Sequence, residues 1–99
     1  MGWSYGGPTR SALQFENLAR QVAHVLPSGL WRTARVLFDR VKRADGPFEI
    51  APWDAHRIGV ALLAAATHPK MPADWGRFAR DVAAAADAAA GAGTPWRWS

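Results

Sequence analysis

The stretch that most restricts the fold is an uncharged apolar run, IGVALLAAAT, at positions 58–67. It has half of the roughly 20 residues that a membrane-spanning helix needs, so it predicts a helix inside a protein core. Pro52 suits the first turn of such a helix, and Pro69 requires that it end before that position. Because the run is apolar on every side, we expect other helices to surround it. The run therefore predicts the central helix of a helical domain.

Three further segments have apolar residues at helical spacing, and each is bounded by start or stop signals. Ser11 and Gln14 have the spacing of a capping box at the start of the first segment, which stops before Pro27. Gly46 follows the second segment. The last segment is rich in alanine, which permits another helix to approach closely. With the central helix, the predicted helices span about residues 11–26, 28–44, 52–67 and 72–90.

Three short segments have apolar residues at every second position, which is typical of half-buried strands. We expect them to form one small antiparallel sheet, built from the two termini and the linker between the second and third helices. Irregular ends that pack their Trp side chains on the helices are the alternative. The predicted fold class is mainly α (α+β), one four-helix domain over residues 1–99 with this sheet. The strands span about residues 2–5, 47–51 and 95–98.

The composition argues against several classes of protein. The chain has no cysteine, which excludes disulfides, thiol catalysis and cysteine-ligated zinc. Its first residues lack the apolar run of a secretory signal, so we expect a cytoplasmic protein without a membrane segment. His24, His56 and His68 are far apart, and the chain has no HExxH, glycine-rich phosphate loop or GxSxG motif. We therefore expect no catalytic residues, no cofactor, no metal and no enzymatic activity.

The net charge of +4 is concentrated in the second predicted helix. Residues 28–45 carry five basic and two acidic residues, hence three of the four excess charges. A phosphate-binding face fits this pattern, since Arg makes bidentate contacts to phosphate. An ordinary solvated face, on which Asp39 pairs with Arg35, fits it as well. The basic residues that share about 100° of the helical wheel are Arg32, Arg35, Lys42 and Arg43.

Six tryptophans occur in 99 residues, and most of them suit a core position. Trp31 differs, because it lies at the edge of the apolar stripe of its helix, beside Arg35. Trp and Arg dominate the binding energy of many protein interfaces. The candidate surface for a partner or a nucleic acid is therefore Trp31, Arg32, Arg35, Lys42 and Arg43. The tryptophans interpreted as core residues are Trp53 and Trp75, in first helical turns, and Trp3, Trp96 and Trp98, in the predicted sheet.

Spaced Gly, Pro and Trp residues form a frame over nearly the whole chain. They are Gly2-Trp3, Val25-Leu26-Pro27, Trp31-Arg32, Gly46-Pro47-Phe48-x-Ile50, His68-Pro69 and Pro95-Trp96-x-Trp98. This frame resembles small proteins of high-GC bacteria that have no assigned function. The resemblance implies a stand-alone domain, and it implies no activity and no site residues.

These observations predict a small non-enzymatic cytoplasmic adaptor or regulator that acts through protein contacts. Its partner is either another protein or a second copy of the chain. The alternative is a nucleic-acid-binding protein that uses the basic face of the helix over residues 28–44.

Overall fold

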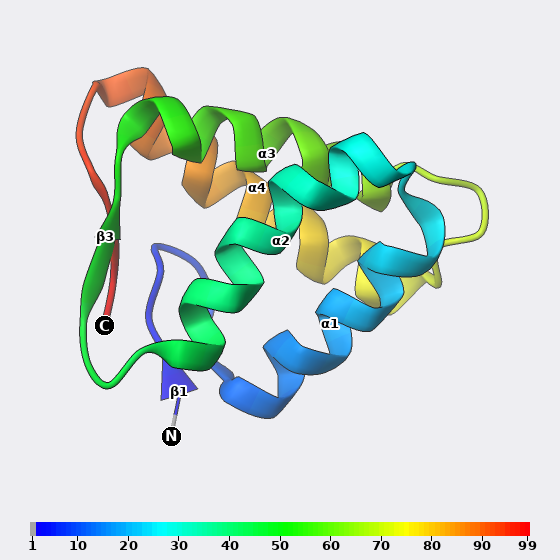
Figure 1. Ribbon diagram of the computed structural model, residues 1–99, viewed down its shortest axis with the longest axis horizontal. Coiled ribbons are helices and arrows are strands. Elements are labelled where there is room, and N and C mark those ends of the chain that lie inside the picture. The colour runs from blue at the N-terminus through cyan, green and yellow to red at the C-terminus, as the bar shows by residue number, and fades with distance from the viewer. Residues whose placement is uncertain (1) are drawn as a thin grey trace.

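The computed structural model describes residues 2–99 and contains four helices with four short strands (Figure 1). It confirms the mainly α fold class, with helix ends within two residues of the predicted ones. The helices are α1 (Ala12–Val25), α2 (Ser28–Arg43), α3 (Pro52–Ala66) and α4 (Ala73–Ala92). The strands are β1 (Gly2–Trp3), β2 (Arg10–Ser11), β3 (Phe48–Ile50) and β4 (Trp96–Trp98).

Helices α3 and α4 pack closely against each other through small residues. A Cβ atom added at Gly59 of α3 would lie 2.9 Å from the Asp87 Oδ1 atom of α4. One added at Gly76 of α4 would lie 3.2 Å from the Ala66 carbonyl oxygen. The Asp87 side chain can move aside, but the Ala66 carbonyl oxygen belongs to the backbone, so a larger residue at Gly76 would press α4 away from the end of α3. The alanine-rich surface of α4 thus allows the close approach expected from its sequence.

The expectation that other helices surround α3 on every side is wrong. Its inner face is buried against α4 and α2, but Trp53, Val60 and Leu63 are 69%, 49% and 46% exposed. The physical reason is that α1 makes only a minor contact with α3, so no element within residues 2–99 covers the outer face. The buried inner face of α3 combines Ile58 and Leu62 with Gly59 and several alanines, whereas Trp53, Val60 and Leu63 point outward.

Helix α1 begins as its sequence predicts. The Ser11 hydroxyl accepts a hydrogen bond from the Gln14 backbone N–H at 3.1 Å, and the Gln14 side chain accepts one from the Ser11 N–H at 2.8 Å. This capping box satisfies two N–H groups that the helix itself leaves free. It fixes the start of α1 directly after β2, and the two-residue turn Leu26 and Pro27 then leads into α2.

The structure has two small antiparallel sheets instead of the single one predicted. β1 pairs with β2, and β3 pairs with β4 so that Phe48 lies opposite Trp98. The N-terminal segment turns at Gly6, whose φ of 98° favours glycine, and therefore pairs with its own continuation into α1. Ser4 still exchanges two backbone hydrogen bonds with Ser99, of 2.7 and 2.9 Å. The two termini thus lie side by side next to β3 (Figure 1).

Aromatic rings fill the core where the termini meet. The Trp96 indole N–H donates a 2.7 Å hydrogen bond to the Tyr5 carbonyl, which ties the C-terminal strand to the N-terminal loop. Trp98 is fully buried and stacks on Phe48 with ring centroids 5.6 Å apart. The interpretation of Trp96 and Trp98 as core residues is confirmed. The other rings around Trp98 belong to Trp3, Tyr5, Phe15 and Trp96.

Candidate functional site

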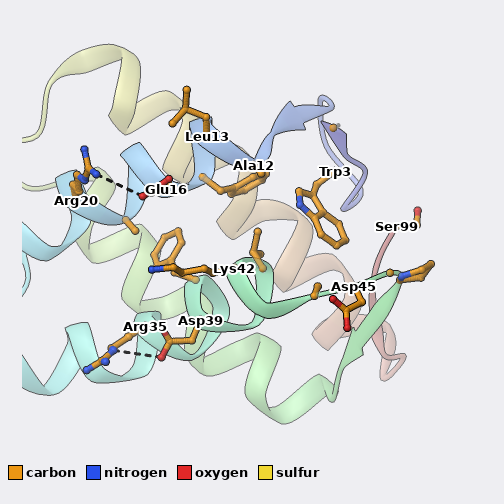
Figure 2. Close-up of a pocket in the computed structure, with 18 of the residues that line it drawn as sticks. Trp3, Ala12, Leu13, Glu16, Arg20, Arg35, Asp39, Lys42, Asp45 and Ser99 are labelled. Atoms are coloured by element: carbon orange, nitrogen blue, oxygen red, sulfur yellow. Dashed lines mark ion pairs between the residues drawn. The ribbon is translucent and has the colours of Figure 1, made fainter.

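A groove of about 860 Å³ lies between α1 and α2 (Figure 2). The two helices form its walls, and the N-terminal strand, the residues after α2 and Ser99 close one end. This volume is within the range of ligand-binding pockets, which is roughly 300–1,000 Å³. A second, smaller hollow of about 350 Å³ lies between α2 and α3.

Aromatic rings line the floor of the groove, and several of the side chains on its α1 side are short. Trp31 stacks on Phe38 from the same helix, with ring centroids 6.1 Å apart, and both rings line the groove. Leu13, which is 64% exposed, lies on the α1 side. The other α1 residues that line the groove include Ala12, Ala19 and Ala23, whose short side chains leave the space above the aromatic rings unfilled.

The rims carry charges of both signs. On α1 the Arg20 guanidinium lies 3.5 Å from the Glu16 carboxylate, and on α2 the Arg35 guanidinium lies 3.4 Å from the Asp39 carboxylate (Figure 2). Both pairs are largely exposed, so they contribute little to stability and are free to exchange partners. With Lys42 and Asp45, the described lining has three basic and three acidic side chains.

The structure divides the five residues that the sequence singled out. Trp31, Arg35 and Lys42 line the groove, whereas Arg32 lines the second hollow together with Arg57 and Asp54 of α3. Arg43 is exposed and lines neither hollow. The basic side chains therefore do not converge on one surface.

The α1 wall of the groove was not expected from the sequence. Glu16 and Arg20 belong to the polar face of an amphipathic helix, and nothing local indicates that this face borders a hollow. Exposed Leu13 was the one available signal, because it is a large apolar residue outside the buried stripe. The contribution of Trp3 was also missed, since it depends on where the N-terminal strand lies.

The interpretation of Trp53 as a core residue is wrong. Its ring is exposed at the first turn of α3 and lies 6.1 Å from the His56 ring. Because Pro52 starts the helix there, Trp53 falls on the outer face that no other helix covers. Trp75, in the corresponding turn of α4, is half-buried and stacks on Phe78.

Two observations concern the titratable groups of the described residues. Along residues 2–99 no group of three His, Asp or Glu side chains is placed to hold a metal ion. Burial raises the pKa of the Tyr5 hydroxyl, helped by the Asp81 carboxylate and opposed by the Arg10 cation. Tyr5 belongs to the aromatic core and does not line the groove.

No helix of the described chain combines the length and the apolar character needed to cross a lipid bilayer.

The sequence profile of one family, described as domain of unknown function (DUF7739), matches residues 2–99. The chain belongs to this family. The resemblance to an uncharacterised domain is thereby confirmed, and an origin in high-GC bacteria stays a prediction. Neither the curated proteins nor the solved structures contain a significant match to the chain.

Proposed function

We propose that this protein is a small non-enzymatic adaptor or regulator of the cytoplasm, and that it acts by docking a protein partner in the groove between α1 and α2. The observation that carries the proposal is the combination of an open aromatic floor with rims of balanced charge. Apolar surface of this kind on a protein chain commonly marks an interaction site. Trp31 serves as the anchor, because buried aromatic side chains dominate interface energies.

The shape of the groove favours an amphipathic helix as its occupant. The walls are two antiparallel helices, and α1 has 14 residues, hence a length of about 21 Å. A partner helix of three to four turns would match this length and place apolar residues at i, i+4 and i+7 over Trp31 and Phe38. Its flanks would carry both acidic and basic residues, which complement the mixed rims.

The rim charges favour a protein partner over a nucleic acid. Glu16, Asp39 and Asp45 would repel a phosphate backbone along the same groove that Arg35 and Lys42 line. Arg35 is in addition paired with Asp39. Because Arg32 and Arg43 lie outside the groove, a nucleic acid would meet scattered cations instead of a continuous track. Nucleic-acid binding is therefore an outcome that the test must distinguish.

A non-enzymatic role agrees with the side chains of the groove. No histidine lines it within the described residues, and two of its acidic groups are paired with neighbouring guanidinium groups. An acid–base reaction needs a group held within reach of substrate and poised to exchange a proton. The polar side chains on the rims are better suited to partner recognition.

The test compares two matched variants, each replacing an exposed helical alanine by tryptophan. Ala23→Trp fills the groove, and Ala88→Trp enlarges α4, whose Ala88 does not line it. Tagged wild-type protein and both variants are used for affinity capture from nuclease-treated native lysate. We expect one protein to be retained by the wild type and Ala88→Trp and lost with Ala23→Trp. Equal retention by all three, or retention that nuclease removes, would contradict the proposal.

A further inference from the structure

The outer face of α3 is a second apolar surface, separate from the groove. Trp53, Val60 and Leu63 are three of the five large hydrophobic residues exposed along residues 2–99. No charged residue occurs between Ile58 and Ala66 in α3. Solvated helix faces normally carry polar side chains, so this face lacks the composition of a surface that stays in water.

The exposed residues of this face follow the spacing of a helix-pairing seam. Together with His56 and Thr67, they lie at positions 53, 56, 60, 63 and 67, which are separated alternately by three and four residues. All five are exposed. At about 100° per residue they fall within an arc of about 80°. Alternation of three and four is the pattern by which two helices interlock side chains. We call these five residues the α3 seam.

We propose that the α3 seam pairs with the α3 seam of a second copy of the chain, with the two helices antiparallel across a two-fold axis at Val60. In this arrangement Val60 meets its counterpart, because position 60 is the midpoint of the seam. Trp53, at one end, lies opposite Thr67 at the other end of the second copy, and His56 lies opposite Leu63. A large ring thus meets a short side chain at both ends, so the seam is complementary to itself, as a two-fold interface requires.

Charge also favours the antiparallel orientation. Near the start of α3, Arg57 lies about 80° around the helix from the centre of the seam and Asp54 lies farther away, at about 140°, while the last turn contains no basic residue. The C-terminal end of a helix carries partial negative charge. An antiparallel pair therefore places Arg57 of one copy near the negative helix end of the other. A parallel pair would instead bring the two Arg57 guanidinium groups together.

The size of the seam predicts a reversible dimer. A stable interface buries about 800 Å² on each partner, which is more than one stripe on a 15-residue helix provides. We therefore expect association in the micromolar range or weaker. None of the five seam residues lines the groove. The dimer and the docking groove are therefore independent of each other, and a test that contradicts one does not contradict the other.

The first test is sedimentation velocity of the full chain over a wide range of concentration. The wild type is expected to shift from monomer to dimer as its concentration rises. Val60→Glu places two like charges at the axis and is expected to weaken dimerisation at least about tenfold. Ala88→Glu, an exposed helical substitution on α4, is the control and should dimerise as the wild type does. Circular dichroism verifies that Val60→Glu keeps its helices.

The second test determines the orientation, and it uses the absence of cysteine from the chain. His56→Cys and Leu63→Cys are mixed and oxidised, and disulfide-linked species are identified by mass. The antiparallel seam predicts the mixed dimer in excess over either self-linked one. Self-linked products in excess would overturn the antiparallel register. A wild type that stays monomeric, or a dimer that persists unchanged in Val60→Glu, would overturn the seam itself.

Discussion

Trp98 and Trp31 are chemically identical residues in opposite surroundings. Trp98 is 0% exposed and is enclosed by rings that come from both termini, α1 and β3. Trp31 is half-buried and has one aromatic neighbour, Phe38, from its own helix. The first region is completed by segments distant in the sequence, whereas the second is left open because α1 presents short side chains to it. We infer that the Trp98 cluster maintains the fold and that the Trp31 groove is available for binding.

The largest expected effect is on stability at Trp98. Replacing it by Ala removes the ring on which Tyr5, Phe15 and Phe48 pack and leaves a cavity in the core. We expect the free energy of unfolding to fall by about 3–5 kcal/mol, measured by urea denaturation. Trp98→Phe is the control and should lose less. A loss below about 1 kcal/mol for Trp98→Ala would show that this cluster does not hold the termini.

Trp31→Ala should separate binding from stability. Because the side chain is only half-buried, we expect a loss of about 1 kcal/mol in the free energy of unfolding, well below that of Trp98→Ala. The groove-dependent capture of a partner should be lost, since the anchor of the floor is gone. Urea denaturation and affinity capture are measured on the same preparation. Unchanged capture would remove Trp31 from the docking surface.

Tyr5 belongs to the Trp98 cluster, and the response of its hydroxyl to pH tests whether this cluster is closed to solvent. Its hydroxyl makes no hydrogen bond of full geometry among residues 2–99 but lies beside the Arg10 guanidinium, so Tyr5→Phe should change the free energy of unfolding by no more than about 1 kcal/mol at neutral pH. The pKa of Tyr5 is raised above 10.0 in the folded state, chiefly by burial. The unfolded chain therefore loses this proton first, and stability that is complete below pH 10 falls as pH rises above it.

The pH measurement is unambiguous because Tyr5 is the only tyrosine of the chain. Tyrosinate absorbance should appear at higher pH in the folded protein than in the urea-unfolded protein. Tyr5→Phe should retain its stability further into the alkaline range than the wild type does. Coincident titration of folded and unfolded wild type would contradict the burial of this hydroxyl.

The smallest effect is expected on the exposed face of the β3–β4 pair, whose other face packs in the Trp98 cluster. The Arg97 guanidinium lies 3.0 Å from the Glu49 carboxylate across the β3–β4 pair, and both side chains are more than half exposed. A double-mutant cycle with Glu49→Gln and Arg97→Gln should give a coupling of about 0.2–0.5 kcal/mol. A coupling above about 1 kcal/mol would mean that this exposed ion pair, and not only the buried aromatic face, contributes substantially to the stability of the β3–β4 sheet.

Local signals predicted the parts of the fold that depend on neighbouring residues. The capping box at Ser11 and the prolines before α2 and at the start of α3 determine where helices begin, and each acts within one turn. Strand pairing was only partly predictable, because the turn at Gly6 returns β1 to β2 and leaves Ser4 alone to reach Ser99. No local pattern distinguishes that arrangement from a single sheet.

The candidate site was predictable only on the α2 side. Trp31, Arg35 and Lys42 were identified from one helical wheel, and in the structure all three line the groove. Glu16 and Arg20 could not be assigned to it, since the packing of α1 against α2 determines which polar face borders the hollow. Exposure of Trp53 was missed for the same reason, because the helices that cover α3 are distant in sequence.

The most direct measurement is site-specific photo-crosslinking in the native cell. A photoreactive phenylalanine analogue replaces Leu13, which lines the groove, or Ala88, which is exposed on α4 outside it. Crosslinked products are separated by mass after nuclease treatment. Docking in the groove predicts a discrete protein adduct from position 13 that position 88 does not form and that Ala23→Trp abolishes. The same adducts from both positions, or no protein adduct from position 13, would contradict it.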